Sequence, residues 1–420
     1  MKRPEILAPA GDFTCLQAAL DAGADAVYFG LDSFNMRVGS GVNFKIEDLP
    51  EISRRCRERG VKAYLTLNSI VFEGEMELAD SIVSKAKPFV DAFIVSDWAV
   101  VESCRRHGAP FHVSTQMSIS NSAAARFMVA QGATRLVLAR ECTLAEVAEI
   151  ARAIAPAEIE CFVHGAQCVA VSGRCLMSHE AFGFSACRGE CRQPCRRKFR
   201  LQAVDLYTDS EGRPVHESDT AFEIEPRTVL SAKDLCSIGF IDKLVAAGIS
   251  SFKIEGRARN ANYVKTCVEA YREAVDAVMS GTYCPELVGR LQASLETVFH
   301  REFSKGLFYG RPGADQFTDS EDSLATRVKR HAGIVIDYFA KAGIAQVKIQ
   351  DRELRAGDEI EIHGPTTGVV ALTLGEMRRD DERPEVARRG EWVTFAAPRC
   401  RVGDKVFFIE RRDLRKPPRI

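Results

Sequence analysis

Short apolar segments alternate with longer amphipathic segments along the first 257 residues of the chain. The longer segments, such as TCLQAALDAGA and LAEVAEIARAIA, carry apolar residues at positions i, i+3 and i+4, which is typical of amphipathic helices. A glycine follows several of them, as expected at the end of a helix. The apolar segments are rich in Val, Ile and Phe and predict eight strands, at residues 5–11, 26–31, 62–68, 92–97, 111–116, 135–141, 158–165 and 251–257.

Eight strand–helix units in succession predict an α/β fold, a TIM-like (β/α)8 barrel. An open, doubly wound sheet is the main alternative. In a barrel the active site lies at the C-terminal ends of the strands. Those ends are polar in this sequence, which favours the barrel and locates the chemistry. The side chains there are Asp12, Arg37, Asn68, Asp97, Gln116, Arg140, Glu141, His164, Glu255 and Arg257.

The alternation of strands and helices ends before the C-terminus, which divides the chain into three parts. An amphipathic helix, YVKTCVEAYREAVDAVMSG, closes a catalytic barrel of residues 1–284. Residues 285–330 read as a helical and linker segment. From residue 331 to residue 420 short strands are separated by turn residues, and this pattern predicts a small C-terminal β-barrel domain.

The connection between the seventh and eighth predicted strands is about 85 residues long, far more than an ordinary βα unit needs. It begins with a cysteine-rich loop, residues 164–200, at the active-site end of the seventh strand. A polar hairpin or excursion follows at residues 205–228, and LSAKDLCSIGFIDKLVAAG (230–248) predicts a helix that returns to the last strand. Connections of this length usually carry function.

The overall charge does not indicate a nucleic-acid-binding protein. The net charge is −1, and the pI is about 6.7. Any RNA site must therefore be a local basic patch, and CRRKFR (195–200) and RRDLRKPPR near the C-terminus are candidates, each equally well explained as solvated charge. No run of about 18 apolar residues is present, and MKRPEILAPAGD lacks a signal core, so we expect a cytoplasmic protein without a membrane span.

The cysteines are concentrated in the long connection. Four of the fourteen follow the pattern Cys168-x6-Cys175-x15-Cys191-x3-Cys195. Disulfides are disfavoured in a reducing compartment, and four thiolates can hold either zinc or a cubane iron–sulfur cluster. Zinc sites prefer two closely spaced pairs, so this wide spacing favours a cluster over zinc or over free thiols.

Three arginines at strand ends suggest a binding site for an acidic small molecule. Arg37, Arg140 and Arg257 each carry a planar fork of N–H donors that matches a carboxylate. The alternative is that they form ion pairs, for which Glu141 and Glu255 are the obvious partners.

The remaining polar residues at strand ends are weaker candidates. His164 precedes the first cysteine of the loop by four positions, so it could donate a proton or hold a substrate; a structural histidine at a strand end is equally plausible. Asn68, Gln116 and Asp97 are candidates for polar contacts to a substrate, and Glu255 joins the arginines as a candidate catalytic residue.

Several motifs resemble one known family, the collagenase-like peptidases of family 32 of unknown catalytic type. The resemblance rests on ILAPAGD and AGADAVYFGL near the start, FVHGAQCVAVSGRC followed by RGECRQPCR, and SAKDL and SFKIEGR. The family includes bacterial hydroxylases of tRNA or ribosomal RNA bases and paired, oxygen-independent ubiquinone hydroxylases. It implies a 4Fe-4S cluster held by Cys168, Cys175, Cys191 and Cys195, with Cys187 or Cys236 as substitutes for a ligand.

The resemblance implies a function more specific than the residues alone. We expect an oxygen-independent RNA hydroxylase that forms 5-hydroxyuridine at the tRNA wobble position, with prephenate as hydroxyl donor. The alternatives are a ribosomal RNA cytidine hydroxylase, a quinone-biosynthesis hydroxylase subunit that needs a partner protein of the same family, a zinc-stabilised RNA-binding protein and a collagenase-like peptidase. The sequence contains no HExxH or GxSxG motif, which disfavours proteolysis.

Overall fold

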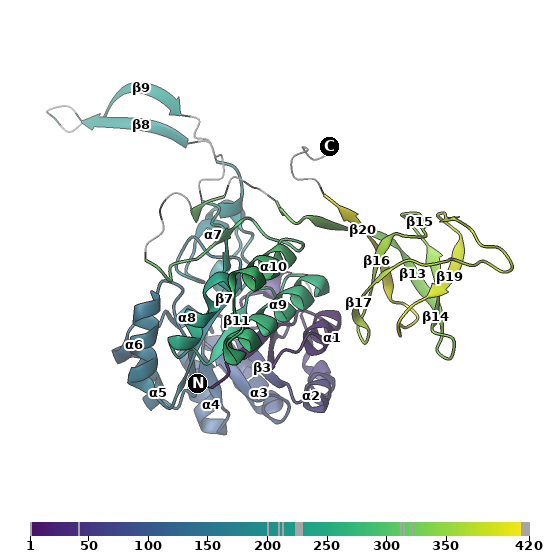
Figure 1. Ribbon diagram of the computed structural model, residues 1–420. Helices are drawn as coiled ribbons and strands as arrows, with labels where there is room; N and C mark the ends of the chain where they lie inside the picture. The colour runs from purple at the N-terminus through teal and green to yellow at the C-terminus, as the bar shows by residue number, and fades with distance from the viewer. Residues whose placement is uncertain are drawn as a thin grey trace.

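The structure is a computed structural model, and it describes residues 2–40, 43–199, 201–208, 211, 214–222, 230–310, 313, 316–318, 320 and 322–412. Eight parallel strands close into a barrel, because β11 pairs with both β1 and β7 (Figure 1). This confirms the predicted TIM-like fold. The barrel strands are β1 (Glu5–Pro9), β2 (Ala26–Gly30), β3 (Lys62–Leu67), β4 (Ala92–Val95), β5 (Phe111–Val113), β6 (Arg135–Val137), β7 (Glu158–Gly165) and β11 (Ser251–Ile254).

Helices follow the strands, and polar residues at the strand ends begin several of them. Asp12 accepts a hydrogen bond from the backbone N–H of Cys15, and Asp97 accepts one from Ala99, so these two aspartates are helix caps. The helices are α1 (Phe13–Asp21), α2 (Leu49–Glu58), α3 (Met76–Ala86), α4 (Trp98–His107), α5 (Ser122–Ala130), α6 (Leu144–Ile154), α8 (Ile241–Ala246), α9 (Ala261–Ser280) and α10 (Pro285–Leu295).

The barrel has an outer and an inner core. Apolar residues between strands and helices form the larger, outer one, and a smaller cluster that includes Leu7, Tyr28 and Tyr64 fills the interior. Buried charges complete the interior at its N-terminal end, where Arg135 contacts Glu5 at 2.5 Å and Glu160 at 3.2 Å. The interior is therefore packed below the strand ends, which leaves the C-terminal mouth for a site.

The long connection between β7 and β11 has its own structure. The predicted polar excursion contains an antiparallel hairpin of β8 (Leu201–Thr208) and β9 (Pro214–Phe222). The helix predicted at 230–248 is partly wrong, since its first part forms β10 (Asp234–Cys236), which pairs antiparallel with the end of β7. Pairing with that strand outweighed helical periodicity, and only α8 in this stretch is an α-helix.

The C-terminal region is antiparallel β-structure with a separate core, as predicted. Its main sheet has the order β17-β16-β20-β13-β14-β19, and it lies beside the barrel near α1 (Figure 1). The strands are β13 (Arg327–Phe339), β14 (Ile344–Ile349), β15 (Leu354–Arg355), β16 (Glu359–Gly364), β17 (Gly368–Thr373), β18 (Val386–Ala387), β19 (Trp392–Ala396) and β20 (Lys405–Arg411), and β12 (Phe303–Ser304) pairs with β10 in the barrel.

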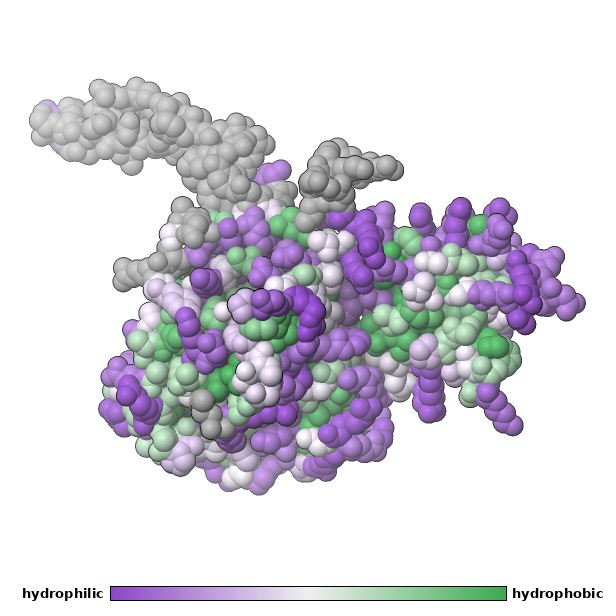
Figure 2. All heavy atoms as spheres, viewed as in Figure 1, coloured by the Kyte–Doolittle hydropathy of each residue, from purple (hydrophilic) through white to green (hydrophobic). Residues whose placement is uncertain are grey.

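The surface is mixed in character. On the face seen in Figure 2, hydrophilic residues surround scattered hydrophobic patches. Within the described part of the chain, none of the helices combines the length and apolar character that crossing a membrane requires.

Candidate active site at the mouth of the barrel

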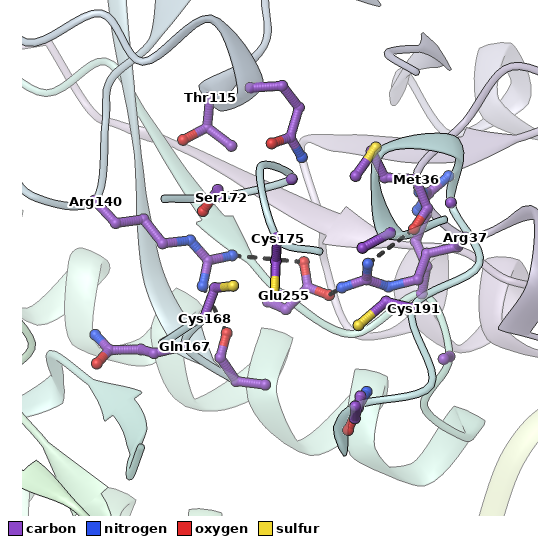
Figure 3. Close-up of a pocket in the computed structure, with 18 of the residues that line it drawn as sticks. Met36, Arg37, Thr115, Arg140, Gln167, Cys168, Ser172, Cys175, Cys191 and Glu255 are labelled. Carbon is purple, nitrogen blue, oxygen red and sulfur yellow. Dashed lines mark hydrogen bonds and ion pairs between the residues drawn. The ribbon is translucent and has the colours of Figure 1, made fainter. Parts of the chain in front are cut away.

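A pocket of about 160 Å³ lies at the C-terminal ends of the strands, under the cysteine-rich loop. That loop contains the short helix α7 (Met177–Phe182), which lies above the end of β7 in Figure 1. All four cysteines of the predicted ligand set line the pocket, and Figure 3 shows three of them around its centre. The fold therefore brings together thiols that are up to 27 positions apart in the sequence, from Cys168 to Cys195.

The four thiols are close enough to influence one another. Burial raises the pKa of Cys195, the adjacent Arg196 opposes this, and the neighbouring Cys168, Cys191 and Cys175 add to the rise. The buried hydroxyl of Ser178 lies 3.9 Å from Cys191 Sγ and accepts a hydrogen bond from the backbone N–H of Arg192 at 3.0 Å. Helix α7 thus orients one of the thiols.

The four thiols are a donor set that either a zinc ion or a 4Fe-4S cluster accepts. Within the described residues, no three His, Cys, Asp or Glu side chains form a group that could hold a metal ion. A zinc site needs its ligands gathered tetrahedrally around one ion, whereas a 4Fe-4S cubane takes one thiolate at each of four iron corners. Four thiols that line one cavity have the number and kind of ligands that a cubane takes.

Cys187 and Cys236 were possible substitutes for one of the four cysteine ligands. Neither Cys187 nor Cys236 is among the described residues that line the pocket. Cys236 lies on β10, where Tyr271 Oη is 3.9 Å from its sulfur, and burial raises its pKa to about 11. Cys236 is half-buried, and a thiol with a raised pKa is less ready to act as a ligand.

Glu255 lies between two arginines inside the pocket. Its Oε1 is 2.6 Å from Arg37 Nη2, and its Oε2 is 4.0 Å from Arg140 Nη2 (Figure 3). Burial favours the neutral acid, but Arg37, Arg140 and Arg257 outweigh it and lower the pKa of Glu255 to about 2. The alternative that the arginines form ion pairs therefore holds for Arg37 and, at a longer distance, for Arg140.

Arg257 is held by the barrel itself. Its Nη1 donates to Asn35 Oδ1 at 3.0 Å and to Thr66 Oγ1 at 2.8 Å. Burial and the nearby Arg37 lower the pKa of Arg257 to about 10. Gly30 permits this position, because a Cβ there would lie 2.5 Å from Arg257 Nη1.

Two buried polar atoms at the pocket have no partner within the described residues: Gln116 Oε1 and Arg140 Nε. Asn68, by contrast, donates to Ser114 Oγ at 3.1 Å and accepts from the backbone N–H of Met36 at 3.3 Å. Buried polar groups almost always find a hydrogen-bond partner. Gln116 and Arg140 line the pocket, but these two atoms are themselves buried in the protein.

His164, a site residue predicted from the sequence, lies at the end of β7. The pocket lining, taken over the described residues, does not include it. A register shift lets β7 carry one extra residue, Val163, opposite β11, and such a bulge turns the next side chain to the other face. His164 is 1% exposed, Tyr271 Oη lies 3.3 Å from its Nδ1, and burial lowers its pKa to about 3.

Sequence reasoning missed Lys253, which lines the same pocket. Its Nζ contacts Glu160 at 2.8 Å and lies 4.4 Å from the ring centroid of Tyr28. Burial lowers the pKa of Lys253, although Glu160 opposes this. The sequence could have predicted Lys253 as a pocket residue, because Lys253, Glu255 and Arg257 alternate in SFKIEGR and so share one face.

The basic segment CRRKFR does not act as a single patch. Arg196 is buried, its Nη2 donates to the carbonyl of Gln167 at 2.6 Å, and its Nη1 donates to Ser231 Oγ at 3.1 Å and to the carbonyl of Ala232. It therefore ties together the two ends of the cysteine loop instead of facing an RNA. Residue 200 and most of the basic C-terminal run, from residue 413 on, lie outside the described residues.

The motifs, the barrel and the cysteine-lined pocket agree with one family. A family model described as peptidase family U32 matches residues 11–318. The chain belongs to peptidase family U32. The resemblance drawn from the sequence is thus confirmed, and the pocket and the whole cysteine loop lie within the matched part of this U32 protein.

Curated relatives within this family carry different names. The chain is 39% identical to a "Collagenase" of Porphyromonas gingivalis, over 97% of this chain and 98% of that protein. It is 34% identical to "tRNA hydroxylation protein P1" of Bacillus subtilis, over 90% of this chain and 88% of that protein. It is 36% identical to an Escherichia coli 23S rRNA 5-hydroxycytidine synthase, over 80% of this chain and 50% of that protein.

Proposed function

We propose that the chain is an RNA-modifying enzyme that hydroxylates an RNA base without molecular oxygen. The observation that carries the proposal is one pocket that combines four thiols with buried arginines, on a chain similar along 90% of its length to a tRNA hydroxylation protein. A base inside a duplex cannot reach such a pocket, so the target lies in a loop.

The favoured target is a wobble uridine of tRNA, converted to 5-hydroxyuridine. The chain covers 88% of the Bacillus subtilis tRNA hydroxylation protein, but only 50% of the Escherichia coli 23S rRNA synthase. A ribosomal RNA cytidine is the second candidate, supported by the 36% identity to that synthase.

Cys168, Cys175, Cys191 and Cys195 would hold a 4Fe-4S cluster. When bound, such a cluster supplies redox or Lewis-acid chemistry beside the hydroxyl donor. The protein contributes the shape around it: Ser178 orients Cys191, and Arg196 fixes the spacing between Gln167 and Ser231.

The hydroxyl donor would be a dicarboxylate such as prephenate. Arg140 and Arg257 line the pocket as buried cations, and Arg140 Nε and Gln116 Oε1 lack partners among the described residues. A carboxylate at the Arg140 guanidinium would gain a charge-assisted hydrogen bond. Glu255 keeps the guanidinium groups oriented before the donor arrives.

A cysteine peptidase is disfavoured by the placement of its candidate base. A cysteine peptidase would need a nucleophile and a base such as Cys168 and His164, but the ring of His164 is buried among Tyr263, Tyr271 and Phe303. A general base must reach the proton that it removes.

Nucleoside mass spectrometry of tRNA and ribosomal RNA tests the proposal, by comparison of a parent strain with a strain that lacks the chain. We expect a nucleoside with one additional oxygen to disappear from tRNA on deletion. Loss from ribosomal RNA would select the second candidate. An unchanged profile of both RNAs would overturn the proposal and favour a quinone-type hydroxylase with a partner subunit.

A further inference from the structure

Two arginine–phenylalanine pairs lie on the outer side of the cysteine loop. The Arg192 guanidinium lies 4.1 Å from the ring centroid of Phe184, and that of Arg197 lies 4.7 Å from the ring centroid of Phe182. We call these four residues the stacking rim. Both rings are more than a third exposed, and both arginines are exposed.

The stacking rim borders the pocket directly. Cys191 and Gln193 line the pocket, and Arg192 stands between them in the chain. Arg197 is likewise two residues after Cys195. A molecule bound on the rim would therefore extend over the pocket mouth.

The two arginines have donors to spare. Neither the Arg192 guanidinium nor the Arg197 guanidinium forms a hydrogen bond or an ion pair with another described residue, apart from its contact with a ring. Arg188 differs, since it pairs with Glu75 at 2.5 Å and stacks on Phe72 at 4.9 Å, so it anchors a neighbouring loop. The rim is thus a set of cations without an internal counter-ion.

The charge of this segment is opposite to that of the chain as a whole. Residues 166–199 hold six Lys or Arg and two Glu, a difference of +4, whereas the whole chain has a net charge of −1. Leu176 adds an exposed apolar side chain to the same loop, at 66% exposure. Local positive charge beside exposed rings is the composition that binds single-stranded nucleic acid.

We propose that the stacking rim binds a single-stranded RNA segment next to the target base and so places that base over the pocket. The proposal rests on the proposed RNA hydroxylation and names the surface that recognises RNA. Each pair offers a flat ring for a base and a cation for a phosphate. An acidic protein would satisfy the charges but would leave the exposed rings without planar partners.

Binding of a labelled tRNA anticodon stem-loop with a wobble uridine, measured by fluorescence anisotropy, tests the rim. The anaerobically purified holoenzyme is compared with the double variant Arg192→Gln/Arg197→Gln. We expect about 10-fold weaker binding and a salt dependence whose slope falls by roughly 0.7 for each lost phosphate contact, with unchanged iron content. A fully paired RNA hairpin should bind weakly to both proteins.

Matched variants separate local from general effects. Arg126 is exposed on helix α5, so Arg126→Gln removes the same charge elsewhere and should leave binding unchanged. Phe184→Ala should weaken binding and leave the salt slope unchanged. Arg192→Lys/Arg197→Lys should keep the salt slope and lose part of the affinity, which tests the rim even if the glutamine variant unfolds.

If both double variants keep the parental affinity for the stem-loop and the parental salt slope, the proposal that the stacking rim binds RNA is overturned. If the double variants bind RNA normally but no longer form a larger protein assembly, the stacking rim is a protein interface. That result would also overturn the proposal. If deletion removes a hydroxylated nucleoside but the variants bind RNA normally, RNA binding by the stacking rim is ruled out and RNA hydroxylation is supported. If deletion changes no nucleoside but the variants lose RNA binding, RNA hydroxylation is ruled out and RNA binding by the stacking rim is supported.

Discussion

Glu255 balances the charges of the pocket. Its carboxylate is ionised although it is buried, because Arg37 and Arg140 stand on its two sides. The pair with Arg37 at 2.6 Å fixes that guanidinium, and Arg140, which also lines the pocket, has a buried Nε without a partner among the described residues. The site is therefore arranged before a donor binds, which reduces the cost of binding.

The pKa of Glu255 predicts a pH-dependent part of the stability. Its folded pKa of about 2 lies below the ordinary 4.5, so the unfolded chain binds more protons in between, and the stabilisation is present above about pH 4.5 and is lost as pH falls toward 2. We expect the difference in unfolding free energy between the parent and Glu255→Gln to be about 2 kcal/mol smaller at pH 3 than at pH 6. Urea unfolding at both pH values measures it, and equal differences would contradict the pKa.

Arg140 should act on the donor more than on the chemistry. Arg140→Gln removes a charged donor at the pocket wall, and we expect KM for prephenate to rise about 10-fold or more with a smaller change in kcat. Steady-state kinetics with RNA at saturation measures the effect, and the iron content serves as the control. A loss of kcat at unchanged KM would contradict a role in donor binding.

The cysteine loop contributes the four thiols to the pocket at the C-terminal ends of the barrel strands. Gly189 has φ +87°, and a Cβ there would lie 2.1 Å from the carbonyl oxygen of Asn35, so the loop packs backbone to backbone against the β2–α2 connection. Arg196 closes the loop from the other side through Gln167. These contacts set the distances between the thiols.

Arg196 and its neighbour provide a matched test of the loop. Arg196→Gln removes a buried clamp, so we expect iron per chain to fall several-fold and the free energy of unfolding to fall by about 2 kcal/mol. Arg197→Gln is the same change at an exposed position and should keep the iron. Iron and acid-labile sulfide analysis measures both variants, and equal iron in the two would contradict the clamp.

The strands were predictable from the sequence, and some of the site was not. All eight apolar segments form barrel strands, because buried parallel strands are apolar runs separated by amphipathic helices. Their polar ends located the pocket. The bulge that turns His164 away and the clamp made by Arg196 depend on pairing with β11 and with residues 231–232, which local patterns do not encode. Lys253 was predictable from alternation.

At the scale of the whole molecule, the C-terminal domain is attached to the barrel wall. Arg55 Nη1 donates to the carbonyl of Pro365 at 2.5 Å, and β17 contacts α1, where a Cβ on Gly368 would lie 3.3 Å from the backbone N of Ala18. The contacts are made by the outer helices α1, α2 and α9. The second domain thus leaves the strand ends, with the pocket and the stacking rim, to form a separate surface.

If the four-thiol pocket hydroxylates RNA, complementation of the deletion strain should depend on the pocket's thiols. The parental chain and Cys191→Ala are each returned to that strain, with equal expression confirmed, and tRNA nucleosides are measured by mass spectrometry. We predict that the parental chain restores a nucleoside with one additional oxygen and that Cys191→Ala does not. Full restoration by Cys191→Ala, or none by the parental chain, would contradict the account.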